Sequence, residues 1–427
     1  MFALLLNVML AVSPQSGSDF YVVDPQIGHD SNPGSLAAPF RSLHRCRTAM
    51  RDSATKICFL RAGIYHFGIG EPSDCDGPAM LWLDARDSGE TWSVYPPDGY
   101  GSAVLDGGST SPSSGLYNGI CINGTSGGVV IDGLQIQRII HTQIQIYDPN
   151  VIIRNNTLHN YTEHSNNGAV NVGGRAATGA QILNNYIYDV AERGINAGPC
   201  FSSDCAGGIS NLTIANNYIF GTCVEEPDCG AIYIVDFQFT RSANITITNN
   251  YIRDTPRGIY LDDGTSNAMV TGNIVVGAPV CFNVHGGANN VYRGNICDET
   301  TNTTTDILRY QNSDPYPSGG GDNGGGNAFI GNIIVSVPPN AGTGYDGDAA
   351  PGVPPLIADN FYQTPTASSG VFADYSPIVG DPQISGWTYR IAPTSPALSA
   401  PVNFVAPPGN WGPPGFVVPQ SGTAPSD

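Results

Sequence analysis

The sequence predicts an all-β protein built as a parallel β-helix, a solenoid of about ten coils, with a cap at its N-terminal end. Two observations favour this fold class. Short alternating strands recur at intervals of a few tens of residues, and no segment between them combines helical period with helical length. The composition also disfavours helices, because 53 residues are glycine and only 12% are charged.

An asparagine motif marks the repeat. An apolar residue and one variable position precede Asn or Gly and then a second Asn, as in IIRNNTL and VTGNIV. The second asparagine of the seven copies is Asn156, Asn185, Asn217, Asn250, Asn273, Asn295 and Asn332. The copies are 22 to 37 residues apart, so the basic coil has 22 or 23 residues and the longer intervals contain inserted loops. We expect the asparagines to stack about 4.8 Å apart and to form a structural ladder.

A second strand lies between successive asparagine turns. It reads GAVNVGG (168–174), GINAG (194–198), GAIYIVD (230–236), GIYLDDG (258–264) and CFNVHGG (281–287). These segments are short, alternating and rich in β-branched or aromatic residues, as strands are. Aligned by their starts, they turn Val172, Ala197, Ile234, Leu261 and Val284 inward, where we expect the apolar core.

The two ends depart from the repeat. The segment around RSLHRCRTAM (41–50) is expected to form the one short helix and to cap the open end of the coils, because exposed strand edges invite aggregation. The predicted organisation is a signal peptide over 1–18, one β-helix domain over 19–400, and a proline-rich tail over 401–427 that is extended or disordered.

Two features predict export to an extracellular or periplasmic location. Residues 2–12 form an apolar run that is too short to span a membrane and fits a secretion signal. The ten cysteines are an even number, as a disulfide set requires, and Cys200/Cys205 and Cys223/Cys229 are each spaced to close a small ring. A zinc site is the alternative for these four cysteines, although no Cys-x-x-Cys spacing occurs.

The charge balance excludes a nucleic-acid partner. The chain has 17 Lys and Arg against 36 Asp and Glu, a net charge of −19. A protein that binds nucleic acid needs basic residues to neutralise phosphates. No later apolar stretch reaches membrane-spanning length, so no membrane partner is expected either.

Three blocks of sequence resemble a known superfamily. FYVVDPQIGHDSNPGSLAAPFRSL is similar to the cap of many bacterial β-helix proteins, and DPQISGWTYRIAPTSPALSA resembles a last coil. DCGAIYIVD, RGIYLDDGTSNAMVTGNIVVG and FNVHGGANNVYRGNI resemble a block of uncharacterised glycoside-hydrolase-like members. Over about 19–400 the chain thus resembles secreted right-handed parallel β-helix proteins of the pectate-lyase-like superfamily. The resemblance implies the fold more strongly than the reaction, because that superfamily contains hydrolases, lyases and epimerases.

One outer face of the second strand collects side chains that suit a sugar. One outward column reads Asn171, Asn196, Tyr233, Tyr260 and Asn283, and the next ends in Asp262 and His285. Aromatic rings suit the C–H faces of a sugar, and amides and carboxylates suit its hydroxyls. The predicted substrate-binding residues are Asn196, Asp228, Tyr233, Arg257, Tyr260 and Asn283.

Carboxylates carry the predicted catalysis. Glycoside hydrolysis uses two of them, about 5 Å apart for retention and about 6.5–9.5 Å apart for inversion. Asp236 and Asp262 on neighbouring coils are the expected pair, with Asp263 a further candidate that strand alternation points away from Asp262. His285, one coil beyond Asp262, is expected to tune its pKa or to bind substrate. Asp-Asp-Gly is also a common turn sequence, in which a carboxylate binds backbone amides instead.

The insert over 199–229 is expected to form a wall beside this face, and its Glu225, Glu226 or Asp228 could supply the second carboxylate. No cofactor and no metal are predicted. A calcium site built from the same aspartates is the alternative, since calcium prefers oxygen ligands.

The sequence thus predicts a secreted glycoside hydrolase that acts on a polysaccharide or oligosaccharide. The first alternative is a polysaccharide lyase or epimerase, which needs a base and a cation beside a uronate carboxylate. Arg253, Arg257, His285 or Tyr260 could serve there, although a net charge of −19 repels an acidic glycan. The second alternative is a carbohydrate-binding protein without catalysis, in which Asp236 and Asp262 would point into turns.

Overall fold

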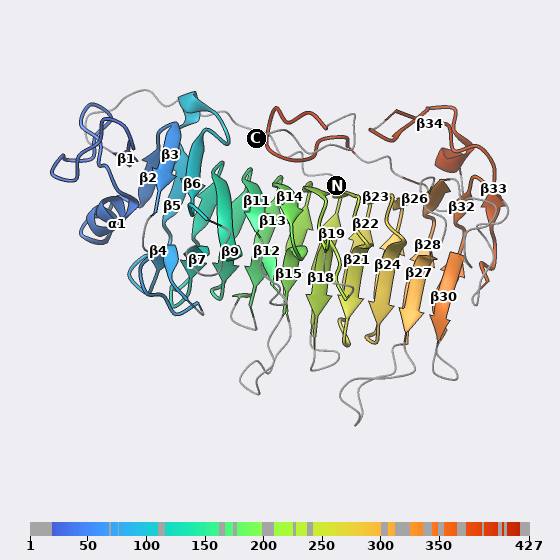
Figure 1. Ribbon diagram of the computed structural model, residues 1–427. Coiled ribbons are helices and arrows are strands. Elements are labelled where there is room, and N and C mark those ends of the chain that lie inside the picture. The colour runs from blue at the N-terminus through green and yellow to red at the C-terminus, as the bar shows by residue number, and fades with distance from the viewer. Residues whose placement is uncertain are drawn as a thin grey trace.

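Three long parallel sheets wind around one axis, with their coils stacked side by side (Figure 1). This arrangement confirms the predicted parallel β-helix. The computed structural model describes residues 19–67, 70–75, 77–109, 116–161, 167–173, 177–198, 209–224, 228–236, 242–299, 306–311, 325–335, 344–348, 354–364, 373–386, 388–399, 404 and 408–418. The predicted signal peptide over 1–18 lies outside these ranges. Across them, no helix has the length and apolar character to cross a membrane.

Each coil adds a strand to each sheet in turn. Sheet 1 contains β1 (Tyr21–Val23), β2 (Ile57–Leu60), β5 (Thr91–Val94), β8 (Val130–Asp132), β10 (Ile152–Arg154), β13 (Gln181–Leu183), β16 (Thr213–Ala215), β19 (Ile245–Thr248), β22 (Ala268–Thr271), β25 (Val291–Arg293), β28 (Ala328–Ile330) and β31 (Leu356–Ala358). Sheet 2 contains β3 (Gly63–His66), β6 (Ala103–Asp106), β9 (Gln135–Ile146), β11 (Thr157–Tyr161), β14 (Tyr186–Val190), β17 (Tyr218–Phe220), β20 (Tyr251–Arg253), β23 (Ile274–Val276), β26 (Ile296–Asp298), β29 (Ile333–Val335), β32 (Phe361–Tyr362) and β33 (Ile378–Val379). Sheet 3 contains β4 (Ala79–Leu83), β7 (Leu116–Ile122), the second half of β9, β12 (Gly168–Val172), β15 (Arg193–Ala197), β18 (Ile232–Val235), β21 (Arg257–Asp262), β24 (Val280–His285), β27 (Asp306–Gln311) and β30 (Gly344–Asp348).

The described part of sheet 1 has twelve strands, so the estimate of about ten coils is too low. Four strands of sheet 1, β1, β2, β5 and β8, precede the first asparagine motif, so the motif does not mark their coils. Two short strands, β34 (Ile384–Ser385) and β35 (Arg390–Ile391), pair outside the coils. Short 3₁₀ turns occupy Pro96–Asp98 and Pro396–Ser399.

The predicted N-terminal helix is α1 (Leu43–Arg51). Ser42 caps it, because its side chain accepts the backbone N–H of Arg45. Leu43 and Met50 on its inner face are buried in the core beside β1 and β2. The helix therefore closes the end of the coil stack, as the sequence predicts.

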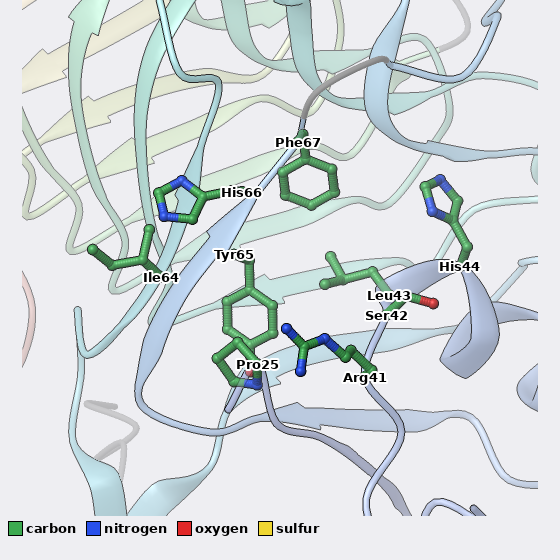
Figure 2. A pocket seen from close by; sticks show the side chains of 9 residues that line it. All are labelled: Pro25, Arg41, Ser42, Leu43, His44, Ile64, Tyr65, His66 and Phe67. Carbon is green, nitrogen blue, oxygen red and sulfur yellow. The ribbon is translucent and has the colours of Figure 1, made fainter. Parts of the chain in front are cut away.

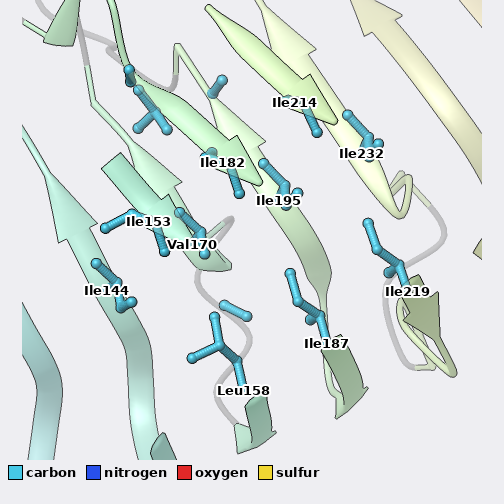
Figure 3. Packing of buried hydrophobic residues seen from close by; sticks show 14 of the residues in the cluster. Ile144, Ile153, Leu158, Val170, Ile182, Ile187, Ile195, Ile214, Ile219 and Ile232 are labelled. Atoms are coloured by element: carbon cyan, nitrogen blue, oxygen red, sulfur yellow. The ribbon is translucent and has the colours of Figure 1, made fainter. Parts of the chain in front are cut away.

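Isoleucine-rich columns fill the interior of the coils. Side chains from the three sheets meet there, and equivalent positions repeat from coil to coil (Figure 3). The inward residues predicted from alternation are all in this core: Val172, Ala197, Ile234, Leu261 and Val284. The alternation of the second strand thus predicts correctly which side chains face inward.

The asparagine ladder forms as predicted at the turn between sheets 1 and 2. From Asn156 to Asn332, each Nδ2 donates to the Oδ1 of the next ladder residue at 2.9 to 3.1 Å. The ladder continues to Asn360 and ends on the carboxylate of Asp374. The preceding residue has a positive φ, 54° at Asn249 and 65° at Gly272, which explains why the motif admits only Asn or Gly there.

Four disulfides are present in the described ranges, Cys46–Cys58, Cys75–Cys121, Cys223–Cys229 and Cys281–Cys297. The predicted small ring between Cys223 and Cys229 is confirmed, and these two cysteines are unavailable as zinc ligands. The second predicted ring, between Cys200 and Cys205, lies outside the described residues.

The described part of the C-terminal segment folds back onto the coils. It has no regular secondary structure, as expected of a proline-rich tail, but it does not hang free of the domain. Trp411 packs on Tyr251 with 4.9 Å between ring centroids, and Phe416 packs on Tyr186 at 4.6 Å. The segment thus covers the aromatic outer face of sheet 2, along the top of Figure 1.

Replacing Trp411 with alanine should lower the free energy of unfolding by about 3 kcal/mol, because it removes a buried aromatic side chain. Val417→Ala is the matched control in the same segment, since Val417 is 80% exposed. Denaturant unfolding of both variants checks this expectation. Equal stability of the two variants would show that the segment contributes nothing to folding.

Candidate functional site

Strands β18, β21 and β24 end side by side on sheet 3, and the candidate site lies at their carboxyl ends (Figure 1). The register pairs Tyr233 with Tyr260 and Tyr260 with Asn283. It also pairs Val235 with Asp262, and Leu261 with Val284, so that Asp262 and His285 are neighbours in the next column. Both outward columns predicted from the sequence are therefore confirmed.

Tyr233 and Tyr260 lie outside the main core and form a small cluster of their own with Val235. Their rings meet edge to face, with centroids 5.0 Å apart. A guanidinium covers each ring: that of Arg193 lies 4.0 Å from the Tyr233 centroid and that of Arg257 5.1 Å from the Tyr260 centroid. These contacts bury the two tyrosines although they face outward.

Asp262 is the centre of a hydrogen-bonded cluster. Its carboxylate accepts hydrogen bonds from the hydroxyls of Tyr233 and Tyr260 and from Nδ1 of His285, the last at 2.7 Å. The residue is only 3% exposed. Burial alone would raise its pKa, but the hydrogen bonds from His285 and Tyr233 outweigh burial and lower the pKa below 3.8. Asp262 is therefore ionised at neutral pH.

Its two partners have raised pKa values. The hydrogen bond to Asp262 raises the pKa of His285 to about 8. Burial and then the negative charge of Asp262 raise the pKa of Asp263 to about 7. Because the groups interact strongly, these values belong to the cluster as a whole. At neutral pH the cluster thus holds one ionised carboxylate, a carboxyl group close to its titration midpoint and a largely protonated imidazole.

Asp263 does not point away from Asp262 as strand alternation predicts. The strand ends at Asp262, and Asp263 has a φ of 39°, so alternation no longer applies to it. Its Oδ1 lies 3.3 Å from Nδ1 of His285. Ligand atoms of Asp262, Asp263 and His285 all lie within 4.8 Å of one another. The second carboxylate beside Asp262 is therefore Asp263.

Asp236, the partner expected for Asp262, follows β18 on the neighbouring coil, and its backbone N–H donates to the backbone oxygen of Asp262 at 3.4 Å. Its Oδ2 accepts the backbone N–H of Ser242 at 2.8 Å, and the residue is buried. A hydrogen bond to a backbone N–H fits the structural alternative, and the catalytic role of Asp236 stays a prediction.

Amides line the face on the N-terminal side of the tyrosines. Nδ2 of Asn196 donates to Asn171, and Nδ2 of Asn171 donates to Gln145. On the other side lies Asn283, which is fully buried. Among the described residues neither polar atom of its amide has a hydrogen-bond partner. A buried unpaired amide is costly, so this position suits a group supplied by a ligand.

Asp228 lies at the edge of the site and is half-exposed, with 62% of its side chain accessible. Its carboxylate is 3.4 Å from Nη1 of Arg257, and its charge raises the pKa of both Asp263 and His285. Glu225 and Glu226 of the same insert lie outside the described residues. Arg253, considered for the lyase alternative, lies on β20 of sheet 2 and pairs with Asp254.

Arg193 is the residue of the site that sequence reasoning missed. Besides covering Tyr233, its Nη2 donates to the backbone oxygen of Asp228 at 3.1 Å. A signal was present, because Arg193 precedes Gly194 and Ile195 just as Arg257 precedes Gly258 and Ile259. Because Arg-Gly-Ile begins both β15 and β21 of sheet 3, the sequence alone marks Arg193 and Arg257 as equivalent positions on the same face.

The cluster fits calcium poorly. Calcium takes six to eight oxygen ligands, whereas Asp262 already accepts three side-chain hydrogen bonds and the backbone N–H of Asp263. The third member of the group, His285, offers nitrogen instead of oxygen. Its Nδ1 donates to Asp262 and is therefore not free to coordinate an ion.

Comparison with known proteins agrees with this architecture. The family model described as right handed beta helix region matches residues 118–296. No curated protein sequence matches the chain. The chain is therefore a right-handed parallel β-helix protein, as the resemblance implied.

Several solved structures share the fold. A GH136 lacto-N-biosidase from Eubacterium ramulus is 11% identical, with 84% of this chain and 67% of that chain covered and a TM-score of 0.52. The A-module of the mannuronan C-5 epimerase AlgE6 from Azotobacter vinelandii is 14% identical, with 79% and 94% covered and a TM-score of 0.55. A PL6 alginate lyase in complex with a trisaccharide is 12% identical, with 93% and 96% covered and a TM-score of 0.50. At these identities the likeness shows the fold alone.

Proposed function

We propose that this protein is a secreted glycoside hydrolase whose acid–base chemistry is carried by Asp262 and Asp263. One observation carries the proposal: two adjacent carboxyl groups have pKa values that their surroundings push in opposite directions. Such a pair supplies a proton donor and an anion at the same pH, which glycoside hydrolysis requires. The neighbours of the same fold that act on glycans lend the proposal general support.

In this proposal, Asp263 is the proton donor to the leaving oxygen, because its pKa of about 7 leaves it partly protonated at neutral pH. Asp262 is the anion whose charge stabilises the positively charged sugar ring. Their oxygens lie within 4.8 Å, closer to the spacing of about 5 Å found in retaining enzymes than to the wider inverting spacing. His285 and the two tyrosines position Asp262 through its hydrogen bonds.

A neutral glycan is the best fit to the face. Arg193 and Arg257 stand over tyrosine rings, with Arg193 3.8 Å from the carboxylate of Glu192 and Arg257 3.4 Å from that of Asp228. Their charges are therefore already matched within the protein. The net charge of −19 also repels an anionic chain at long range.

A lyase or epimerase is the second candidate, because His285 and Arg257 could act as base and cation beside a uronate. The raised pKa of His285, about 8, makes it a poor base at neutral pH, which favours hydrolysis. The non-catalytic alternative predicts that Asp262 points into a turn. Asp262 also accepts hydrogen bonds from two tyrosines and a histidine, which a turn does not supply.

A panel of neutral and acidic polysaccharides tests the proposal. Reducing ends and the ultraviolet absorbance of unsaturated uronates are measured in the same tubes, with and without a calcium chelator. We expect reducing ends without absorbance, on a neutral glycan and unaffected by the chelator. Absorbance that rises with the reducing ends would establish elimination instead, and inactivity on every glycan would favour a binding protein.

The pH dependence of kcat follows from the raised pKa of Asp263. If Asp263 donates a proton, kcat should fall as the pH rises through about 7, because the deprotonated group cannot donate. Asp228→Asn removes a negative charge that raises the pKa values of Asp263 and His285, so the falling limb should move to lower pH. Rates from pH 4 to 9 on both proteins check the direction. A limb that moves to higher pH would rule out Asp263 as the donor.

A further inference from the structure

A pocket of about 400 Å³ lies at the N-terminal cap, between α1 and β3 (Figure 2). Sheet 2 places β3 six coils before β20, the strand that shares a coil with Asp262. At about 4.8 Å per coil, the pocket is roughly 30 Å along the axis from the candidate catalytic cluster. It is therefore a separate feature of the surface, of a size typical of small-ligand sites.

The pocket has basic side chains on its wall. Arg41, His44 and His66 all line it. The carboxylates nearest the two histidines are already held by arginines, since Glu71 binds Arg47 and Asp106 binds Arg138.

Arg41 is the residue of the pocket wall best placed to bind an anionic ligand. Its backbone N–H is bound by Asp30, but among the described residues no carboxylate pairs with its guanidinium. Figure 2 shows that guanidinium turned toward the side of the pocket formed by Tyr65 and Pro25. Asp30 is itself occupied by the backbone of Arg41 and Ser42 and by the Ser42 hydroxyl, so it does not neutralise the guanidinium directly.

Most of the remaining wall is apolar or aromatic. The hydroxyl of Tyr65 donates to the backbone oxygens of Val23 and Arg61, which leaves only the ring for a ligand. Ile64, which is 50% exposed, and Phe67 also line the pocket. A cation beside aromatic and aliphatic surface suits a ligand with both an anionic group and C–H faces.

We propose that this pocket binds a sugar that carries a carboxylate, a uronic-acid residue. A guanidinium binds the two oxygens of a planar carboxylate through parallel hydrogen bonds, which an ammonium group cannot do. The positive end of α1, whose first turn begins at Leu43 on the pocket wall, favours the same anion. The aromatic and aliphatic walls then take the C–H faces of the sugar ring. The chain would thus hold an acidic glycan at its cap, independently of the catalytic face.

Calorimetric titration of the full chain with D-glucuronic acid tests this proposal, with D-glucose and acetate as comparison ligands. We expect one saturable site for glucuronate, and at least tenfold weaker binding in Arg41→Gln. Arg45→Gln on α1, four residues further along the chain, is the matched control, because its guanidinium covers Phe40 at 4.7 Å and Arg45 does not line the pocket. Thermal unfolding of both variants shows that each is folded.

Four results would overturn the proposal. If glucose binds as tightly as glucuronate, the carboxylate contributes nothing to binding. If acetate binds as tightly as glucuronate, the sugar ring contributes nothing. Unchanged affinity in Arg41→Gln would place the ligand elsewhere. Asp263→Asn should bind glucuronate as the unmodified protein does, whereas loss of binding in that variant would locate the ligand at the catalytic face.

Discussion

Replacing Asp262 with asparagine is expected to lower kcat at least a thousandfold on any glycan that the protein cleaves. The substitution keeps the shape of the side chain but removes the negative charge to which Tyr233, Tyr260 and His285 donate. It also removes the charge that helps to raise the pKa of Asp263, so the proposed donor becomes more acidic. Both the anion and the tuned acid are lost, and losses at groups that act together in catalysis are commonly this large.

Asp148→Asn is the matched control for this variant. Asp148 is also buried, at 5% exposure, and its carboxylate caps a turn by accepting the backbone N–H groups of Gly124 and Thr125. We expect normal kcat in this variant, with only a loss of stability. Activity that survives in Asp262→Asn, with both variants folded, would contradict the catalytic role of the cluster.

Replacing Asn250 with alanine is expected to lower the free energy of unfolding by about 4 kcal/mol. Its Oδ1 accepts hydrogen bonds from the backbone and the side chain of Asn217. Its Nδ2 donates to the backbone oxygen of Ile214 and to Asn273. The alanine variant leaves these groups buried without partners, and each such group costs about 1–3 kcal/mol.

Two further variants distinguish the stability contributed by the asparagine ladder from the loss that any substitution on this coil would cause. Thr248→Ala lies on the same coil, where its half-buried hydroxyl meets Thr271 at 3.1 Å, and it should cost less than about 1 kcal/mol. Asn250→Asp keeps the shape but buries a carboxylate with no side-chain donor hydrogens, so we expect a loss at least as large as in the alanine variant. Urea unfolding of the three variants measures these differences. A cost in Asn250→Ala as small as in Thr248→Ala would show that the ladder contributes little.

The coil architecture was predictable because it repeats. Each turn needs a left-handed residue followed by an asparagine that bridges two coils, so the same two residue types recur and mark every coil that contains them. The first coils lack that mark, which is why the predicted number of coils fell short. The sequence gives no periodic pattern from which burial of the C-terminal segment could be predicted, because its aromatic residues Trp411 and Phe416 lie among prolines and glycines.

The candidate site was predictable as far as the strands extend. Alternation and coil spacing correctly place Tyr233, Tyr260, Asn283, Asp262 and His285 in neighbouring columns. Beyond the strand ends, backbone angles decide where a side chain points, and these do not follow from strand alternation. For this reason strand alternation places Asp263 on the wrong side of the strand.

Digestion of the cleaved glycan in water enriched in oxygen-18 tests the central claim most directly. Hydrolysis adds a solvent oxygen across the broken bond, so mass spectrometry should find the label in the new products, and Asp262→Asn should abolish its appearance. Elimination breaks the bond without adding water, so the products would be unlabelled and would include an unsaturated sugar. Labelled products that depend on Asp262 are the predicted result, whereas unlabelled, unsaturated products would contradict a hydrolase built on the Asp262–Asp263 pair.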